Sequence, residues 1–272
     1  MATPIGNARD ISLRALDTLA ASDAILAEDT RVTAKLLAIH GIARPLLAYN
    51  DHNAPKMRPK LLEKLRAGAR LALVSDAGTP LVSDPGMKLV REALAEGIAA
   101  YPVPGASAAL AALSVAGLAS DRFLFAGFLP AKSGARRQVI AEFAGIRASL
   151  IFFESPQRLA ESLADLGELL GPREALVARE LTKLHEEQRR GTLDALAAAY
   201  AHEDTPRGEI TLVIAPPRES APPEVAKLDA FLRAALAHMP VKTAAGLAVE
   251  AFGVSRRDAY ARALVLKGDG DG

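Results

Sequence analysis

The chain has 272 residues, of which 50% are apolar and 24% charged, a composition typical of a globular protein with a buried core and about two domains. Because it contains no cysteine and its five histidines are scattered, disulfides, cysteine-based zinc sites and a cysteine nucleophile are excluded, and we expect no metal site. The formal net charge is +1, aromatic residues make up only 4%, and no apolar run is long enough to span a bilayer, so we expect a cytoplasmic protein without membrane contact and without extensive base stacking.

Short apolar segments alternate with helical patterns up to the prolines at 216 and 217, which predicts an α/β fold with mostly parallel sheets. Three of the predicted helices have clear start signals. They are Met87–Glu96 after Asp84-Pro85, Gln157–Leu170 after Ser155-Pro156, and Leu193–Tyr200 after Thr192. The predicted strands are Asp23–Ala27, Arg70–Ser75, Ala100–Val103, Phe123–Phe128, Ser149–Phe153, Ala175–Ala178 and Glu209–Ala215.

Two changes in this pattern divide the chain into three parts. An apolar helical run ends at Gly117 and a new strand begins near Phe123, which predicts one α/β domain at residues 1–117 and a second at 118–216. Prolines follow the last strand, and beyond them the pattern is only helical. Residues 224–267 are therefore predicted to form a small helical module that packs on the main body. Its helices are predicted at Val225–His238, Val241–Phe252 and Ser255–Lys267.

Two motifs near the beginning of the chain are candidate parts of a ligand site. Ala2-Thr3-Pro4-Ile5-Gly6-Asn7 is a tight turn before a helix near Arg9–Ala20, and taken alone it is as typical of any connection between a strand and a helix. Glu28-Asp29-Thr30-Arg31 directly follows a predicted strand, and the carboxyl ends of parallel strands are where such sheets bind ligands. Two interpretations stay open for it: a ligand site, or capping of the next helix by Asp29 with Glu28 solvated.

Two later loops contain small residues that allow a ligand to approach the backbone. Residues 75–86, Ser-Asp-Ala-Gly-Thr-Pro-Leu-Val-Ser-Asp-Pro-Gly, leave a buried strand and open a helix, and their exposed amides and carbonyls suit a zwitterionic ligand that carries a nucleoside. Val103-Pro104-Gly105-Ala106-Ser107-Ala108 leads into an alanine-rich helix, where Ser107 either contacts a ligand or caps the helix. No GxGxxG follows a strand and no P-loop is present, which disfavours a dehydrogenase or a P-loop enzyme.

In this order, the four segments resemble the tetrapyrrole methylase superfamily, the class III S-adenosylmethionine (SAM)-dependent methyltransferases. Gly127–Pro130, Glu154–Arg158 and Arg179–Glu186 narrow the resemblance to the branch that methylates the 2′-hydroxyl of a decoding-centre cytidine in 16S rRNA. The resemblance covers almost the whole chain. It implies two α/β domains with SAM in the cleft between them, a homodimer, and a methyltransferase acting on 16S rRNA of the small ribosomal subunit. Members of the family carry a strand before the first motif, so we expect a native form that extends beyond Met1.

A ribose hydroxyl is a weak nucleophile, so the reaction needs a base or a charge-stabilising group, for which Glu28, Asp29, Glu180 and Lys183 are the candidates. Glu28 and Arg31 are predicted to shape the acceptor site, with Glu180 and Lys183 facing it from the second domain. Lys183 acts as a base only if burial lowers its pKa, and otherwise it anchors a phosphate or stabilises alkoxide character. The residues predicted to bind SAM, many of them through backbone atoms, are Asp76, Ala77, Gly78, Thr79, Asp84, Pro104, Ser107, Ala108, Phe153, Leu181 and Gly208.

RNA binding requires positive surface, and three basic clusters supply candidates. They lie at Ala54–Arg70, at Lys132 with the arginines that follow it, and at Arg189-Arg190. A solvated helix face explains any single cluster equally well. Gly253–Arg257 opens a helix and resembles part of a helix-turn-helix, for which packing or dimer support is a competing role. The predicted RNA contacts are Lys56, Arg58, Lys132, Arg136 and Arg137.

Two other functions stay open. The first is a small-molecule methylase of the same fold that acts on a tetrapyrrole such as a precorrin, and the arginine-rich surface and the helical C-terminus argue against it. The second is a non-catalytic RNA-binding assembly factor, and the intact pattern of the SAM loops argues against that.

Overall fold

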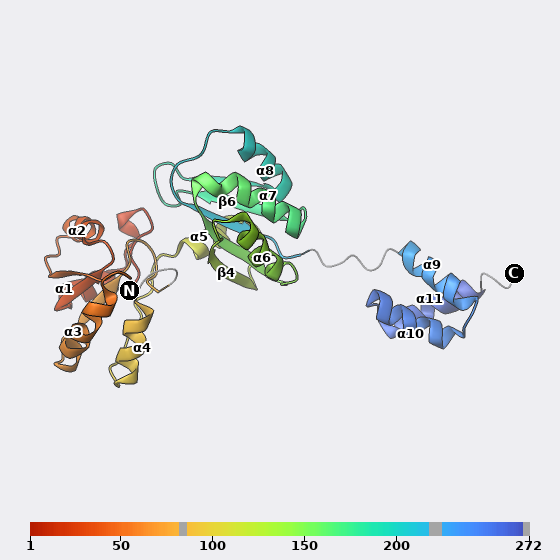
Figure 1. Cartoon of the computed structure of the whole chain (residues 1–272), viewed down its shortest axis with the longest axis horizontal. Coiled ribbons are helices and arrows are strands. Elements are labelled where there is room, and N and C mark those ends of the chain that lie inside the picture. The colour runs from red at the N-terminus through yellow and green to blue at the C-terminus, as the bar shows by residue number, and fades with distance from the viewer. Residues whose placement is uncertain (82–85, 218–224, 269–272) are drawn as a thin grey trace. The chain divides into compact units, whose positions relative to one another are not determined.

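The computed structural model describes residues 1–81, 86–217 and 225–268. The chain divides into two units, Met1–Pro216 and Pro217–Gly272. The first unit contains two β-sheets, each covered by helices on both faces (Figure 1). The predicted α/β class with a C-terminal helical region is therefore confirmed.

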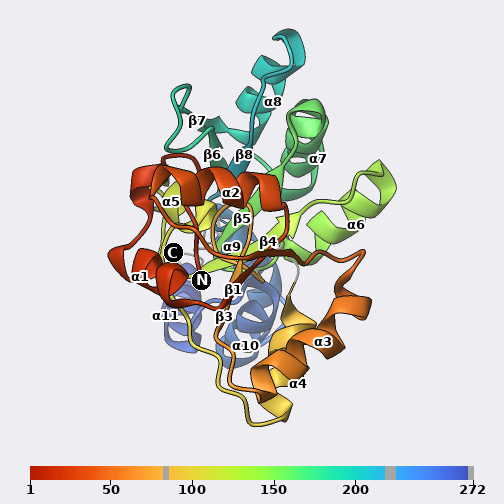
Figure 2. The same ribbon diagram turned by 90° about the vertical axis from the view of Figure 1, so that its left-hand side faces the viewer.

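The first sheet has three parallel strands in the order β2 (Leu46–Ala48), β1 (Ala24–Ala27) and β3 (Leu71–Val74). One face of this sheet is covered by α1 (Leu13–Ala21) and α2 (Thr30–Ile39). The other face is covered by α3 (Ala54–Arg66) and α4 (Met87–Ala95), and these two helices lie side by side in Figure 2. Successive strand residues point to opposite faces. Ile25 and Ala27 accordingly pack with α1 and α2, whereas Leu26 packs with α3 and α4.

The second sheet has five strands in the order β4 (Phe123–Phe128), β5 (Ser149–Glu154), β8 (Ile210–Ile214), β6 (Glu174–Arg179) and β7 (Glu187–Thr192). Only β4 and β5 run parallel. The prediction of mostly parallel strands is therefore correct for the first sheet and wrong for the second. The short connection between β6 and β7 is one reason, because a parallel return needs a crossover of a dozen residues or more.

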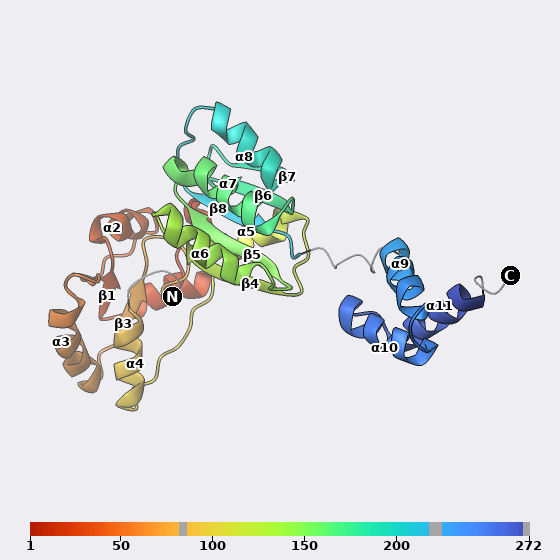
Figure 3. The same ribbon diagram turned by 45° about the vertical axis from the view of Figure 1, so that its right-hand side comes forward.

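Helices cover both faces of the second sheet (Figure 3). One face carries α6 (Ser133–Phe143), α7 (Leu159–Leu170) and α8 (Leu193–His202). The other face carries α5 (Ala108–Ala116), whose alanines pack on Ile151, Leu176 and Val213. Helix α5 thus lies on the second sheet, although the predicted boundary at 117 assigns it to the first domain.

Most predicted strands of the first unit are confirmed, and the exceptions have local causes. The strand predicted at Ala100–Val103 is wrong, because Val103 makes no ladder and instead accepts one hydrogen bond from the Ala2 N–H at 3.0 Å. Strands β2 and β7 were not predicted, since β2 is very short and β7 is polar. Thr192 caps α8 as predicted. The predicted cap at Asp84-Pro85 lies outside the described residues. Two short 3-10 helices complete the unit, at Ala8–Asp10 and Pro156–Arg158.

The described part of the second unit contains three helices, α9 (Val225–Leu236), α10 (Val241–Phe252) and α11 (Arg256–Gly268). They pack around a core of their own that includes Leu232, Ala248 and Ala263, so their mutual packing does not depend on the main body. Pro222 and Pro223 of the predicted linker lie outside the described residues. No helix in the described ranges is both long and apolar enough to cross a membrane.

Candidate active site

A cavity of about 400 Å³ lies where the loop after β3 and the segment before α5 meet the end of β5 and the beginning of β8. We call it the sheet-end cavity. Its volume is within the range of about 300–1,000 Å³ that is typical of small-molecule sites. Most of the residues predicted to bind SAM line it, namely Asp76, Ala77, Gly78, Thr79, Ser107, Ala108, Phe153 and Gly208.

The backbone of one wall is held by hydrogen bonds between three segments. Gly78 exchanges two backbone hydrogen bonds with Thr3, at 2.9 and 3.1 Å, and the Thr79 hydroxyl donates to the Ala106 carbonyl at 3.1 Å. The φ of Gly78 is +77°, a conformation that side chains disfavour. This wall therefore presents main chain and small side chains at fixed positions.

Ser107 occupies the N-cap position of α5, but its side chain makes no capping hydrogen bond there. Of the two interpretations left open by the sequence, capping by the hydroxyl is thus not observed. Because Ser107 lines the sheet-end cavity, its hydroxyl is placed to serve a ligand together with the backbone at the start of α5.

The opposite wall comes from the second sheet and contains residues that were not predicted to bind SAM. Phe128 and Phe153 pack edge to face with ring centroids 5.5 Å apart and give this wall an apolar surface. Phe128 ends one predicted strand and Glu154 directly follows another, a signal that could have marked them. The lining residues not predicted are Ile5, Phe128, Glu154, Ser155, Pro156, Glu209, Ile210 and Thr211.

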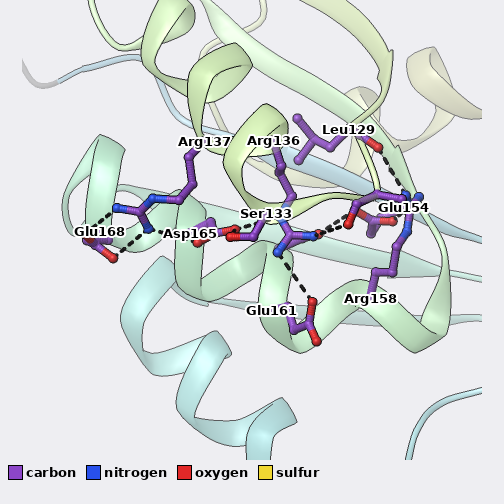
Figure 4. A network of polar contacts seen from close by, with 11 residues as sticks. Leu129, Ser133, Arg136, Arg137, Glu154, Arg158, Glu161, Asp165 and Glu168 are labelled. Carbon is purple, nitrogen blue, oxygen red and sulfur yellow. Dashed lines mark hydrogen bonds and ion pairs between the residues drawn. The ribbon is translucent and has the colours of Figure 1, made fainter.

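Glu154 is buried at the edge of this cavity, and its carboxylate is fully engaged (Figure 4). It forms an ion pair with Arg158 at 2.6 Å and accepts hydrogen bonds from the Ser162 hydroxyl at 2.6 Å and the Ser155 N–H at 2.7 Å. The carboxylate thereby holds this wall of the cavity in place. Among the described residues, no three acidic or histidine side chains gather closely enough to hold a metal ion.

A second cavity of about 250 Å³, the helix-side cavity, adjoins the first. It lies between the Ala2–Asn7 motif, α2, the loop after β3 and the loop after β6, and its α2 wall is largely apolar. Lys183 is the one residue predicted to be catalytic that lines it. Ile5, Asp76, Ala77 and Glu209 line both cavities, so the two share a wall.

Lys183 is held by two carboxylates. Its Nζ lies 2.8 Å from Glu180 Oε1 and 2.9 Å from Glu209 Oε2. Burial acts to lower the pKa of Lys183, but the hydrogen bonds to Glu180 and Glu209 outweigh burial and raise that pKa above 10.5. The hydrogen bond from Lys183 in turn lowers the pKa of Glu180. The pair is therefore ionised at neutral pH, and the condition under which Lys183 acts as a base is not met.

The loop that carries this pair has an unusual backbone. Glu180 and Thr182 have φ values of +51° and +66°, which side chains rarely adopt and which cost about 1–3 kcal/mol each. Hydrogen bonds hold both residues: Glu180 Oε1 accepts from the Glu209 N–H at 2.9 Å, and Thr182 Oγ1 accepts from the Asn7 N–H at 3.1 Å. The loop thereby ties β8 and the first motif together.

Gly208 offers a test of this arrangement. Its φ is +100°, and a Cβ there would lie 2.4 Å from the Glu180 carboxyl group. We expect Gly208→Ala to displace Glu180, to release Lys183 and to lower both the affinity for the methyl donor and the rate of methyl transfer. Calorimetry and single-turnover kinetics measure the two effects.

Gly171→Ala is the matched control, because Gly171 has a φ of +76° but no atom within 4 Å of the added Cβ. This variant should lose about 1–3 kcal/mol of stability, because a φ of +76° with a ψ of −170° is a conformation almost restricted to glycine, and it should keep its activity. Equal behaviour of the two variants would show that only backbone strain matters at Gly208.

Asp29 and Arg31 act on each other rather than on either cavity. Asp29 caps α2 and binds the exposed Arg31 guanidinium at 2.6 Å, and this hydrogen bond lowers the pKa of Asp29 to about 2. The capping interpretation is thus observed. Asp76 Oδ1 accepts from the Asp29 N–H at 2.9 Å, which links the two acidic loops. Neither Glu28 nor Arg31 lines the two cavities, so their predicted place at the acceptor site lacks geometric support.

Two of the described residues that are predicted to bind SAM do not line the sheet-end cavity. Leu181 is buried in the cluster beneath α5, and Pro104 is exposed. Asp84 lies outside the described residues.

Two of the residues predicted to contact RNA, Lys56 and Lys132, have exposed side chains. The predicted arginines instead form ion pairs within the protein. Arg58 is bound to Glu92 at 2.9 Å, and Arg137 is bound to Asp165 and Glu168.

The prediction for Arg136 is wrong. Its side chain is 2% exposed, and its guanidinium lies 2.6 Å from Asp165 and 3.4 Å from Glu161 between α6 and α7 (Figure 4). The third basic cluster is also engaged, since Arg189 binds Glu203 and Arg190 binds the end of α5.

Comparisons with known proteins agree over nearly the whole length. A family profile described as tetrapyrrole (corrin/porphyrin) methylases matches residues 2–197, and one described as the RsmI C-terminal HTH domain matches residues 222–267. A protein of Mesorhizobium japonicum named ribosomal RNA small subunit methyltransferase I is 52% identical over 100% of this chain and 94% of its own. A protein of the same name from Erythrobacter litoralis is 51% identical over 98% and 94%.

Solved structures share the fold at low sequence identity. Diphthine synthase matches with a TM-score of 0.61 at 17% identity over 79% of this chain and 88% of its own. The uroporphyrin-III C-methyl transferase of Thermus thermophilus, complexed with S-adenyl homocysteine, matches with a TM-score of 0.55 at 19% identity over 78% and 94%.

Proposed function

Because the chain belongs to the ribosomal RNA small subunit methyltransferase I family of the tetrapyrrole methylases, we propose that it transfers the methyl group of SAM to the 2′-hydroxyl of a decoding-centre cytidine in 16S rRNA. One observation of the structure carries this proposal: the sheet-end cavity and the helix-side cavity share a wall. A donor in one and an acceptor in the other would meet along that wall, and in-line methyl transfer requires such alignment.

The sheet-end cavity has the chemistry that SAM needs. Main chain around Gly78 and the start of α5 suits polar contacts to a nucleoside and an amino acid, and the Phe128–Phe153 wall suits a flat purine ring. The Asp76 carboxylate suits an ammonium group. When bound, SAM supplies an electrophilic methyl group on a sulfonium.

The helix-side cavity suits the acceptor nucleoside. Val32, Leu36 and Ile39 of α2 give it an apolar wall for a base, and Lys183 places an ammonium group at the opposite side. During transfer, an oxygen–carbon bond forms, a sulfur–carbon bond breaks and the hydroxyl proton must leave. Glu209, a carboxylate that lines both cavities, is placed to accept that proton, while Lys183 stabilises the negative charge that develops on oxygen.

The most direct test of this function measures the methylation of 16S rRNA. Mass spectrometry of 16S rRNA from a strain lacking the gene should show one missing ribose methyl group, restored by the intact gene. In vitro, labelled methyl groups should pass from SAM to undermethylated 30S subunits and not to precorrins. Transfer to a precorrin would support the tetrapyrrole alternative, and absence of SAM binding would support the assembly-factor alternative.

We further propose that the enzyme works in the cytoplasm, where small ribosomal subunits are made, and that it is a homodimer. Light scattering should then give twice the chain mass of 28.5 kDa. A mass of one chain at micromolar concentration would contradict the dimer.

Helix α3 is proposed as part of the RNA path. Lys56, Lys60 and Lys64 repeat every four residues, are exposed and lie on one face of the helix, whereas Arg66 is bound to Glu96 at 2.7 Å. Replacing the three lysines by Gln should weaken rRNA binding and reduce the slope of log K against log[salt] by about 2–3, since each lost phosphate contact removes about 0.7–0.9. Arg66→Gln is the control and should leave the slope unchanged. Binding titrations at several salt concentrations give both slopes.

A further inference from the structure

The C-terminal unit contains a cavity whose described lining residues all belong to that unit. This basic cavity, about 490 Å³ in volume, is lined by Lys242 and Ala245 of α10 and by Arg256, Arg257 and Tyr260 of α11. Its three cations are exposed, and none of the described residues that line it is acidic. It therefore combines a concave surface with concentrated positive charge.

The positions of these three cations lower the stability of the helices that carry them. Lys242 is the second residue of α10, and Arg256 and Arg257 are the first two residues of α11. Helix N-termini carry partial positive charge and favour acids, so cations at these positions repel the helix dipole. An anion in the cavity would relieve that repulsion.

Elsewhere in the unit, an arginine that is partly buried forms an ion pair. Arg262 binds Asp229 through two hydrogen bonds, at 2.7 and 2.5 Å. By contrast, Arg257 is 96% exposed, and its nearest described carboxylate, that of Asp258, lies 3.9 Å away. Asp258 is itself engaged by the Ser255 hydroxyl at 2.7 Å. The charge of the basic cavity is thus left for a partner.

We propose that the basic cavity binds the phosphate backbone of the substrate rRNA, as an anchoring site separate from the catalytic cavities. The identity of the nucleic acid rests on the proposed function. Arginine and lysine are the side chains that bind phosphate most strongly, and three of them in a cavity of this size suit consecutive phosphates of a strand better than one small ion. Tyr260, 43% exposed, adds a ring and a hydroxyl for a ribose. The contact does not depend on sequence, because it involves no pattern of donors and acceptors that reads bases.

The test uses the full chain and an unmethylated 16S rRNA fragment made by transcription. Arg256→Gln/Arg257→Gln should weaken binding about tenfold near physiological salt and reduce the slope of log K against log[salt] by about 1.4–1.8, the value for two lost phosphate contacts. Affinity for SAM and the rate at saturating RNA should stay at wild-type values.

Arg233→Gln/Lys267→Gln is the matched control, since it removes the same charge from exposed positions of the same unit that do not line the cavity. Its slope should stay close to that of the wild type. Thermal unfolding followed by circular dichroism checks that both variants are folded.

The outcomes separate this inference from the proposed function. Equal slopes for the two double variants would overturn the anchoring site even if the wild type methylates rRNA. Titration with inorganic phosphate gives a second arm: saturation of the cavity by phosphate without competition against RNA would also overturn it. A wild type that binds RNA through this cavity but transfers no methyl group would instead contradict the proposed function alone.

Discussion

Lys183→Met should lower the rate of methyl transfer by about 10²–10³-fold while the affinity for SAM changes little, because the variant removes a fixed positive charge from beside the attacking oxygen. Lys183 lies in the helix-side cavity and not in the sheet-end cavity, so the loss should fall on kcat. Single-turnover kinetics with undermethylated 30S subunits measure the chemical step, and calorimetry measures SAM binding.

Lys183→Arg is the control that distinguishes charge from proton transfer. Arginine keeps the charge but cannot act as a base at neutral pH, so it should restore a substantial part of the rate. Near wild-type activity of Lys183→Met, or complete inactivity of Lys183→Arg, would contradict the electrostatic role.

The pH dependence gives an independent check of the same role. The raised pKa of Lys183 means that its favourable contribution is present below 10.5 and is lost only as the pH rises through the higher folded value. The lowered pKa of Glu180 means that its contribution is present above 4.5 and is lost as the pH falls through the lower folded value. The ion pair should therefore stay intact between about pH 6 and 9.

Arg136→Met should lower the free energy of unfolding by about 3–5 kcal/mol, the largest stability effect that we expect from a single side chain of the first unit. Arg136 is almost fully buried, and its removal leaves the Asp165 carboxylate, itself 12% exposed, without its partner at 2.6 Å. Chemical denaturation of wild type and variant measures the difference.

Two further variants show whether the buried pair is the cause. Arg137→Gln affects a residue that is one-third exposed, and it should change stability by no more than about 1 kcal/mol. Arg136→Met/Asp165→Leu removes both buried charges and should recover much of the loss. A stable Arg136→Met protein with weakened rRNA binding would show that Arg136 contacts RNA after all.

The sequence pattern predicted the positions of most strands, but it did not predict the direction in which neighbouring strands pair. Leu150–Phe153 and Ala175–Ala178 are continuous apolar runs, which is the pattern of strands buried on both faces. The same pattern contains no information about direction, so the antiparallel pairing of β8 with both neighbours was not foreseen. The edge strand β7 was missed because its residues, Glu187–Thr192, are polar.

Site residues could be predicted from the sequence where they lie within one loop. They could not be predicted where the site depends on contacts between segments that are distant in the sequence. The residues around Gly78 and Ser107 were identifiable from small residues at strand ends. Glu209 was missed because its importance arises from contact with Lys183, 26 residues earlier in the chain. The burial of Arg136 likewise depends on Asp165, which α7 brings into place from 29 residues away.

The central claim is that the sheet-end cavity holds the methyl donor with its methyl group facing the wall shared with the helix-side cavity. A crystal structure with S-adenosylhomocysteine measures this directly. We expect the ligand against Gly78, Ser107 and Phe153, with its sulfur nearest to Ala77 and Glu209. A ligand bound elsewhere, or bound with its sulfur turned away from the helix-side cavity, would contradict the account.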